Sequence, residues 1–232
     1  MNLASYQKFT LLDYPGRIAT TVFTVGCNFR CSFCHNPELV LGSQFVAHGN
    51  ENEKEFFKFL KSRKGKLEAV CITGGEPTIQ KDLIEFIVKV KKMGYLVKLD
   101  TNGMRPDVLK KVLDMKIVDY VAMDIKNSLK NYEKTVCTKV DLERIKMSAE
   151  MIMNSRVNYD FRTTVVPGIH SEKDFEEIAE WIGGAKKYFL QRFRDMKTLD
   201  NNLKEKIKGK KIDLEKIQKK LKKHFGEVGI RG

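Results

Sequence analysis

The feature that most constrains the fold of this chain is a regular alternation of strand-like runs and amphipathic helical stretches. The helical stretches carry apolar residues on one face, as Leu83, Ile87 and Val90 do within Gln80–Met93. Alternating strand and helix units predict an α/β fold in which helices cover a parallel sheet. Six runs rich in β-branched and aromatic residues form the predicted strands: Arg17–Val25, Leu67–Thr73, Tyr95–Asp100, Val118–Asp124, Asn158–Val165 and Lys186–Gln191.

The number of units predicts an incomplete barrel. A closed barrel of eight units typically needs about 250 residues, whereas this chain has 232 residues. We therefore predict a partial, open (β/α)6 barrel that is TIM-like, in a single domain over residues 1–232. Its core runs from about residue 6 to residue 191, and a helical C-terminal extension covers residues 192–232. Gly42–Asn52 is expected to be a polar loop.

Composition narrows the classes of function. The formal net charge is +13, but no aromatic-interleaved basic patch or nucleic-acid motif accompanies it, so a solvated surface is expected rather than nucleic-acid binding. No segment resembles a signal peptide or a membrane span, which predicts a cytoplasmic protein. Five cysteines in such a chain argue against a disulfide framework.

Three of the cysteines, Cys27, Cys31 and Cys34, lie within eight residues directly after the first predicted strand. Thiolates are ligands that suit iron–sulfur clusters and zinc. A cubane cluster usually takes four cysteines, so three would leave one iron open to a substrate, as an open position does in catalytic metal sites. Cys71 and Cys137 lie far away in the sequence and are expected to be core or surface thiols.

Two other metal sites fit part of this segment. Cys31–His35 matches the C-x-x-C-H pattern of covalent haem attachment, but that pattern leaves Cys27 without a role and normally follows export. A zinc site could combine the three cysteines with His35, and it would leave the motifs further along the chain unexplained.

The cysteine spacing C-x3-C-x-aromatic-C resembles the signature of the radical S-adenosylmethionine (SAM) superfamily. Phe33 holds the aromatic position, where family members contact the adenine of SAM. The longer stretch Gly26–Val40 is similar to the activating enzymes of glycyl radical enzymes, most of all to the activators of anaerobic ribonucleoside-triphosphate reductase. The resemblance implies a [4Fe–4S] cluster on Cys27, Cys31 and Cys34, with SAM as the second cofactor.

A glycine pair closes the second predicted strand. Gly74, Gly75 and Glu76 resemble the family's GGE motif, which binds the methionyl amino group of SAM. Glycine permits a close approach of the backbone, and the Glu76 carboxylate favours an ammonium group. A cysteine motif followed by this sequence at a strand end is far more specific than either motif alone.

Two further strand ends carry motifs of the same family. Asp100, Thr101 and Asn102 occupy positions that lie beside the SAM ribose in the activating enzymes. Lys126, in an Asp-x-Lys motif with Asp124, would face the SAM carboxylate. Asp100 and Asp124 could also hold a monovalent cation, because hard cations prefer oxygen ligands. The alternative for Asp124 is an internal ion pair.

The remaining motifs lie near the two ends of the predicted core. Arg162 begins a segment that resembles the family's R-x-x-V-V-P-G, in which the arginine helps to hold SAM. Asp13 lies in Asp13–Arg17, a variant of the activators' D-G-P-G motif, whose aspartate lies near the incoming glycyl loop. Tyr14 replaces a glycine of that motif.

The resemblance implies reductive cleavage of SAM to a 5′-deoxyadenosyl radical, which takes a hydrogen atom from a glycine of a partner glycyl radical enzyme. The electron would come from a flavodoxin or ferredoxin. Cluster and SAM carry the chemistry, so no side chain is nominated as general acid or base. Two alternatives remain: a small-molecule radical SAM enzyme, such as a deazapurine-forming synthase, and a basic zinc-binding nucleic-acid module.

Overall fold

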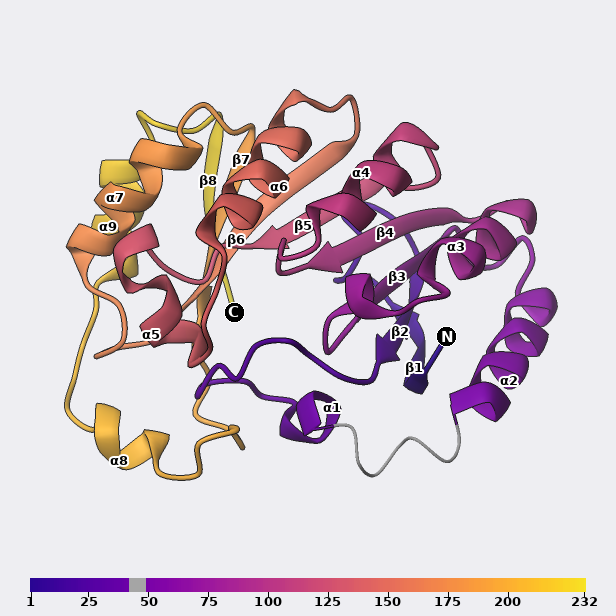
Figure 1. The fold of residues 1–232 in the computed structure, drawn as a ribbon, viewed down its shortest axis with the longest axis horizontal. Helices are drawn as coiled ribbons and strands as arrows, with labels where there is room; N and C mark the ends of the chain where they lie inside the picture. The colour runs from indigo at the N-terminus through magenta and orange to yellow at the C-terminus, as the bar shows by residue number, and fades with distance from the viewer. Residues whose placement is uncertain (42–48) are drawn as a thin grey trace.

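The computed structural model describes residues 1–41 and 49–232 (Figure 1). Within these residues, one sheet of eight strands forms the centre, and the strand order in the sheet is the order in the sequence. The first pair of strands is antiparallel and every later pair is parallel. The strands are β1 (Leu3–Thr10), β2 (Ala19–Thr24), β3 (Ala69–Gly74), β4 (Leu96–Thr101), β5 (Tyr120–Asp124), β6 (Asn158–Val165), β7 (Lys187–Arg192) and β8 (Glu227–Arg231).

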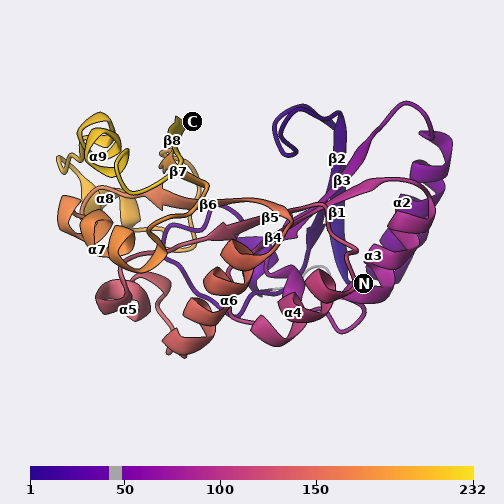
Figure 2. The same cartoon turned by 90° about the horizontal axis from the view of Figure 1, so that it is seen from above.

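Helices cover the outer side of a curved sheet. Figure 2 shows α2, α3, α4, α6, α7 and α9 on that side, while the inner side is open between β1 at one edge and β8 at the other. The helices are α1 (Pro37–Leu41), α2 (Gly49–Ser62), α3 (Leu83–Lys92), α4 (Pro106–Asp114), α5 (Tyr132–Val136), α6 (Leu142–Asn154), α7 (Glu172–Ile182), α8 (Leu203–Ile207) and α9 (Leu214–Leu221). Two short 3-10 turns, Pro77–Ile79 and Leu129–Asn131, precede α3 and α5.

The two faces of the sheet differ in chemistry. Successive strand residues point to opposite faces, so Val97 and Leu99 of β4 lie fully buried in the apolar core that the helices share. Lys98 and Asp100 alternate with them and therefore point to the inner face. The apolar outer face holds the fold together, and the inner face is left for polar contacts.

The predicted open barrel is confirmed, because the six predicted strands correspond to β2–β7 and all run parallel. The edges differ from the prediction. β1 adds an antiparallel strand before the core, and the C-terminal extension contains β8 as well as helices. Four apolar residues of this extension are buried: Leu214, Ile217, Leu221 and Phe225.

The predicted loop Gly42–Asn52 is wrong in its last part. Residues 42–48 lie outside the described part of the chain, but α2 already begins at Gly49. The Asn52 side chain donates hydrogen bonds to the carbonyl oxygens of Leu3 (2.9 Å) and Ala4 (3.1 Å). This anchors the first turn of α2 on the edge strand β1, a contact that the local sequence does not reveal.

No helix in the described residues combines the length and the apolar character needed to cross a membrane.

Candidate active site

A cavity of about 220 Å³ lies on the inner side of the sheet, at the carboxyl ends of the parallel strands. Parallel barrels place their chemistry at this end. The structure brings thirteen of the fourteen predicted site residues to its walls: Cys27, Cys31, Cys34, Phe33, Gly74, Gly75, Glu76, Asp100, Thr101, Asn102, Asp124, Lys126 and Arg162.

The cysteine loop follows β2 and forms one wall of the cavity. Cys31 is buried, whereas Cys27 and Cys34 are half-buried. The backbone N–H of Phe29 donates to Sγ of Cys27 at 3.4 Å. Burial raises the pKa of the Cys27 thiol to about 11 and that of Cys31 to about 12, so both are protonated until a metal displaces the proton.

The donors on this wall are three cysteine thiols, a set that suits an iron–sulfur cluster. Within residues 1–41 and 49–232, no three His, Cys, Asp or Glu side chains converge on one point as ligands of one ion would. In a cubane each cysteine binds its own iron, so the three thiols need not converge. His35, the fourth ligand of the zinc alternative, contacts the Arg194 carbonyl oxygen through Nε2 (3.0 Å) and stacks on Phe193.

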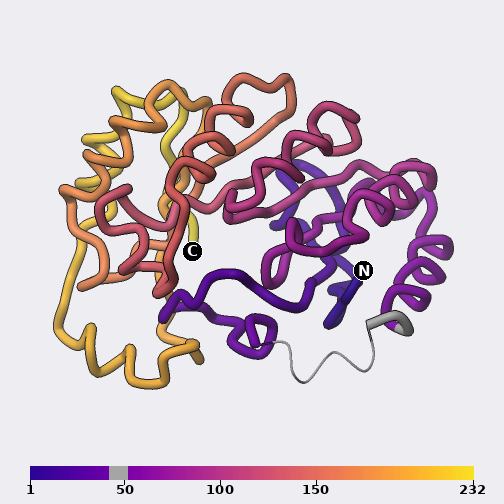
Figure 3. The backbone as a smooth tube through the Cα atoms, in the orientation of Figure 1, coloured from indigo at the N-terminus to yellow at the C-terminus, as the bar shows by residue number. Residues whose placement is uncertain are grey.

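The C-terminal extension braces this loop from outside. The backbone N–H of Leu199 donates to the carbonyl of Cys34, and that of Asp200 donates to the carbonyl of Ser32, both at 2.9 Å. The tube in Figure 3 follows this segment as it returns from β7 to the cysteine loop. The sequence assigned no role to residues 192–232, and the structure shows that their first part supports the loop that carries the three thiols.

The glycine pair lets two strand ends meet. Gly75 N–H donates to the carbonyl of Thr24 (2.9 Å), and Glu76 N–H donates to that of Gly26 (2.8 Å). A Cβ atom on Gly75 would overlap the carbonyl oxygen of Gly26. The end of β3 therefore lies directly against the start of the cysteine loop, an approach that only glycine permits.

We expect Gly75→Ala to destabilise the protein by about 1–3 kcal/mol, the usual cost of overpacking, and to weaken SAM binding. The clash involves backbone on both sides, so it would push the cysteine loop away from β3. Urea unfolding and SAM binding by equilibrium dialysis would measure both effects. Gly94→Ala is the control, because a Cβ there meets no atom within 4 Å, and its strain comes from its positive φ alone. SAM affinity unchanged in Gly75→Ala would contradict this reading.

Glu76 links the ends of two strands. The carboxylate is 1% exposed and accepts hydrogen bonds from N–H and Oγ1 of Thr78, from Oγ1 of Thr101 (2.8 Å) and from N–H of Asn102 (2.7 Å). Burial raises its pKa in spite of these four donors. Glu76 thus ties β3 to β4, and Oε2, with one donor, keeps capacity for an ammonium group.

A network of charges forms another part of the cavity wall. Arg162 donates from Nε to Asp124 and from Nη2 to Asp100 (2.9 Å). Lys126 Nζ lies 2.9 Å from the other oxygen of Asp124, and Lys98 pairs with the other oxygen of Asp100. The ion-pair alternative for Asp124 is thus what the structure contains.

These pairs keep the network ionised although it is buried. Burial disfavours the carboxylate of Asp124, but Arg162 and Lys126 outweigh it and hold the pKa well below its usual range. The pKa of Lys126 is raised in turn, because the Asp124 carboxylate outweighs the cost of burial. The result is a fixed, charged surface facing the cavity, suited to a ligand carboxylate.

Three contributors to the site were missed by the sequence interpretation. Lys98 is buried beside Asp100. Asn28 accepts from Nδ2 of Asn102 at 2.8 Å, which joins the cysteine loop to β4. His170 is buried, accepts a hydrogen bond from Val166 N–H and lies 2.8 Å from the Lys126 carbonyl oxygen. Alternation along β4 placed Lys98 on the face of Asp100; nothing local marked the other two.

Asp13 is the predicted site residue that does not line the cavity. It lies in the connection between β1 and β2 and accepts a hydrogen bond from Thr21 Oγ1 (2.6 Å). In Figure 2 this connection curls toward the open side of the sheet. Its predicted place near an incoming protein loop stays a prediction.

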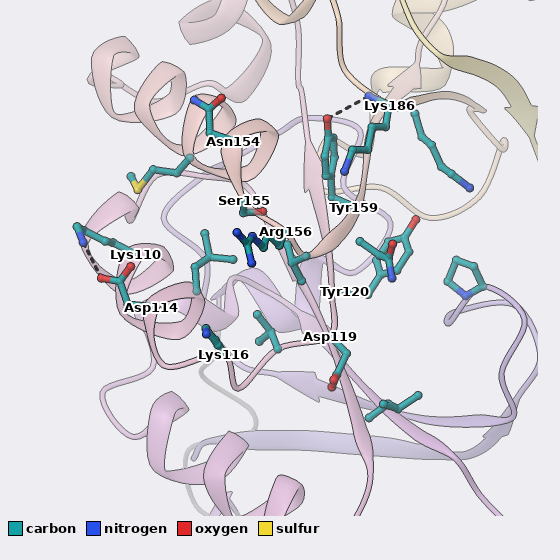
Figure 4. A pocket seen from close by; sticks show the side chains of 18 of the residues that line it. Lys110, Asp114, Lys116, Asp119, Tyr120, Asn154, Ser155, Arg156, Tyr159 and Lys186 are labelled. Carbon is teal, nitrogen blue, oxygen red and sulfur yellow. Dashed lines mark hydrogen bonds and ion pairs between the residues drawn. The ribbon is translucent and has the colours of Figure 1, made fainter.

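A larger groove, of about 1290 Å³, lies at the opposite end of the sheet. Figure 4 shows its rim of surface residues, among them Lys110, Lys116, Arg156 and Lys186, with the Lys110–Asp114 ion pair at one side. It is formed by connections that lead into the strands. Because parallel α/β folds bind ligands at the carboxyl ends of their strands, we place the functional site in the smaller cavity.

Comparison with known families identifies this architecture. Residues 21–182 match the model of the radical SAM superfamily, which is more than half of the chain. The chain belongs to the radical SAM superfamily. It is an enzyme of this superfamily, and its cofactors are a [4Fe–4S] cluster and SAM. The zinc-module and haem alternatives are therefore set aside.

Individual relatives agree with this assignment. The chain is 34% identical over 227 residues to a Methanocaldococcus jannaschii protein named as a glycyl-radical enzyme activating enzyme, covering 95% of this chain and 91% of that protein. It is 33% identical over 130 residues to the pyruvate formate-lyase-activating enzyme of Listeria monocytogenes, covering 53% and 52%. SuiB of Streptococcus suis with bound SAM shares the fold, with a TM-score of 0.65 at 15% identity over 90% of this chain and 48% of SuiB.

Proposed function

We propose that this radical SAM enzyme activates a glycyl radical enzyme, and that its partner is an anaerobic ribonucleoside-triphosphate reductase. The activating role is supported by the relative that spans nearly the whole chain. The choice of partner rests on the Gly26–Val40 segment, which is most similar to the activators of that reductase. We further propose that residues 1–232 form a single domain, since one sheet runs from Leu3 to Arg231, and that it works in the cytoplasm, where thiols stay reduced.

Each wall of the cavity has a proposed task. When bound, the reduced cluster and SAM supply a 5′-deoxyadenosyl radical and release methionine. Cys27, Cys31 and Cys34 would hold the cluster, while Lys126 and Arg162 would present positive charge to the SAM carboxylate.

The remaining cavity residues position the rest of SAM. Phe33 would contact the adenine, and Gly74–Glu76 would receive the amino group. Asp100, Thr101 and Asn102 would lie at the ribose. A glycine of the partner then gives up its α-hydrogen atom, so that 5′-deoxyadenosine and a glycyl radical are the products.

The open side of the sheet supports a macromolecular substrate. Three apolar side chains are exposed beside it, in β1 and the connection to β2: Phe9 (54% exposed), Leu11 (62%) and Leu12 (91%). Exposed apolar patches commonly mark protein interaction sites. Asp13 follows directly in the chain, which places a polar group between this patch and the inner face. We infer that the partner docks here and inserts its glycine loop toward the cavity.

We expect Leu12→Asp to lower the rate of partner activation by about tenfold or more, the size of effect found for interface hot spots. The cavity is untouched by this change, so 5′-deoxyadenosine formation without partner should stay at the wild-type level. Electron paramagnetic resonance of the partner's glycyl radical and chromatography of 5′-deoxyadenosine would measure the two. Met115→Asp, at an equally apolar exposed position (51%) beyond α4, is the control. Equal activation by wild type and Leu12→Asp would exclude docking at this patch.

The electron donor is proposed to be a flavodoxin or a ferredoxin. Residues 192–211 carry eight lysines and arginines but three acidic residues, and their first part lies against the cysteine loop. A positive surface beside the cluster site suits a small acidic redox protein, because complementary charge steers association.

The proposed function is tested by anaerobic reconstitution with iron and sulfide, followed by reduction and addition of SAM and the anaerobic reductase. The expected result is a glycyl radical on the reductase and stoichiometric 5′-deoxyadenosine. A radical on pyruvate formate-lyase and none on the reductase would keep the activating role and overturn the choice of partner. Turnover on a small substrate, with no radical on any glycyl radical enzyme, would favour the small-molecule alternative, such as a deazapurine-forming synthase.

A further inference from the structure

Lys98 is a buried lysine that no motif accounts for. It lies on the inner face of β4, two residues before Asp100, and is 3% exposed. Lysine is almost never this buried unless it is paired, and its partner is one carboxylate oxygen of Asp100. The inner face near the cavity therefore holds a third buried cation, Lys98, in addition to the predicted Lys126 and Arg162.

The carboxylates that were predicted to bind a monovalent cation are already occupied by side-chain cations. Lys98 and Arg162 each take one oxygen of Asp100. Arg162 and Lys126 each take one oxygen of Asp124. Arg162 spans the two carboxylates, of which Asp100 lies on β4 and Asp124 on β5. An added metal ion would face three fixed positive charges, so these residues do not suit the monovalent cation that the sequence predicted here.

The charge balance of this group points to a role for Lys98. Lys98, Lys126 and Arg162 against two carboxylates leave one positive charge, which matches one incoming carboxylate. Without Lys98 the group would be neutral, and a metal cation would be needed to restore the balance. Two further carboxylates lie nearby. Asp160 is paired with Arg231 and Tyr120. Glu76 has four neutral donors, so its negative charge is left for the SAM amino group, and the SAM carboxylate is left for the excess positive charge.

We propose that the Lys98 ammonium group replaces the monovalent cation of the SAM site, so that SAM binding requires neither Na⁺ nor K⁺. The inference rests on the proposed placement of the SAM carboxylate beside Lys126 and Arg162. Lys98 acts through Asp100 and does not touch SAM, so it is a positioning residue. It fixes the charge and the orientation of Asp100 as a bound metal ion would.

The test is SAM affinity of the cluster-loaded protein, measured by equilibrium dialysis in NaCl, KCl or tetramethylammonium chloride at one ionic strength. Tetramethylammonium is too large to enter a carboxylate site. Wild type should bind SAM equally, within about twofold, in all three salts. Lys98→Met should lose about tenfold or more in tetramethylammonium, in line with the effect of removing a close opposite charge, and should recover in NaCl or KCl. Lys91→Met, which removes a pair with Asp119 outside the cavity, should behave as wild type.

A second measurement does not depend on the cofactors. The melting temperature of cluster-free Lys98→Met should rise when Na⁺ or K⁺ replaces tetramethylammonium, whereas that of wild type should not. Wild-type SAM binding that needs Na⁺ or K⁺ would overturn this inference and leave the proposed function intact. A Lys98→Met variant indifferent to the cation in both measurements would also overturn it. Absence of SAM binding by wild type in every salt would overturn the placement of SAM itself.

Discussion

Cys27→Ala, reconstituted and reduced without oxygen, is expected to form no 5′-deoxyadenosine above the background without protein. Cys27 is one of three thiols at the cavity, and the two remaining cysteines of the chain lie elsewhere, Cys71 buried and Cys137 exposed. With two cysteines the loop cannot hold a cubane in a fixed place. Iron and sulfide content, absorbance near 400 nm, and chromatography of 5′-deoxyadenosine would measure the loss.

The matched control for this experiment is Cys137→Ala. Cys137 is exposed and ends α5, so its thiol is free to react but lies outside the cavity. This variant should keep the iron content and the product yield of wild type. Full product from Cys27→Ala, or equal loss in both variants, would contradict the assignment of Cys27 as a ligand.

Arg162→Met is expected to lower the free energy of unfolding by about 3–5 kcal/mol, because it leaves buried carboxylates without a shared partner. Arg162 contacts both Asp100 and Asp124, and its side chain is 15% exposed. Urea unfolding of the cluster-free protein at pH 7 would measure the loss. Arg105→Met is the control, since that arginine makes a two-point pair with Asp107 at the surface, and exposed pairs contribute about 0–1 kcal/mol.

The stability difference between wild type and Arg162→Met should also depend on pH. In wild type the pKa of Asp124 is lowered, burial being outweighed by Arg162 and Lys126. Its ionised form therefore adds stability above the unfolded-state pKa, and that stability is lost as the pH falls through the folded-state value. In Arg162→Met the neighbouring carboxylates repel each other and take up protons at higher pH. The gap between wild type and variant should thus shrink as the pH falls from 7 toward about 4.

A second substitution separates charge from packing. Adding Asp124→Asn to Arg162→Met removes one of the two stranded carboxylates and should return part of the lost stability. If the double variant is no more stable than Arg162→Met, the loss comes from the missing volume of the arginine. A single Arg162→Met loss no larger than that of Arg105→Met would show that the network does not stabilise the fold.

The strands that could be predicted from the sequence are the ones buried on their helix-covered face. Runs such as Ala69–Gly74 carry enough β-branched residues to be recognised without their neighbours, so β2–β7 and the open parallel barrel could be predicted. The edge strands could not. β1 (LASYQKFT) has mostly polar, part-exposed residues in its centre, and β8 has five residues and is separated from α9 by residues 222–226. For both strands, pairing with a neighbour decides the conformation, and the local pattern alone does not.

The same division runs through the site. Cys27, Cys31 and Cys34 lie within eight residues of chain, so their spacing alone was enough to predict a shared ligand. A motif at a strand end likewise predicts its own place at the cavity. Contacts between strands are different. That Arg162 of β6 reaches across β5 to Asp100 of β4 depends on the register of three strands. Lys98 pairs with Asp100, the carboxylate predicted to bind a cation, because both side chains are buried. Burial of this kind cannot be read from the local sequence. The sequence by itself determined which residues could bind SAM and a cluster. The tertiary structure decided which charged side chains pair with one another, because electrostatic partners are set by distance in space and not by distance along the chain.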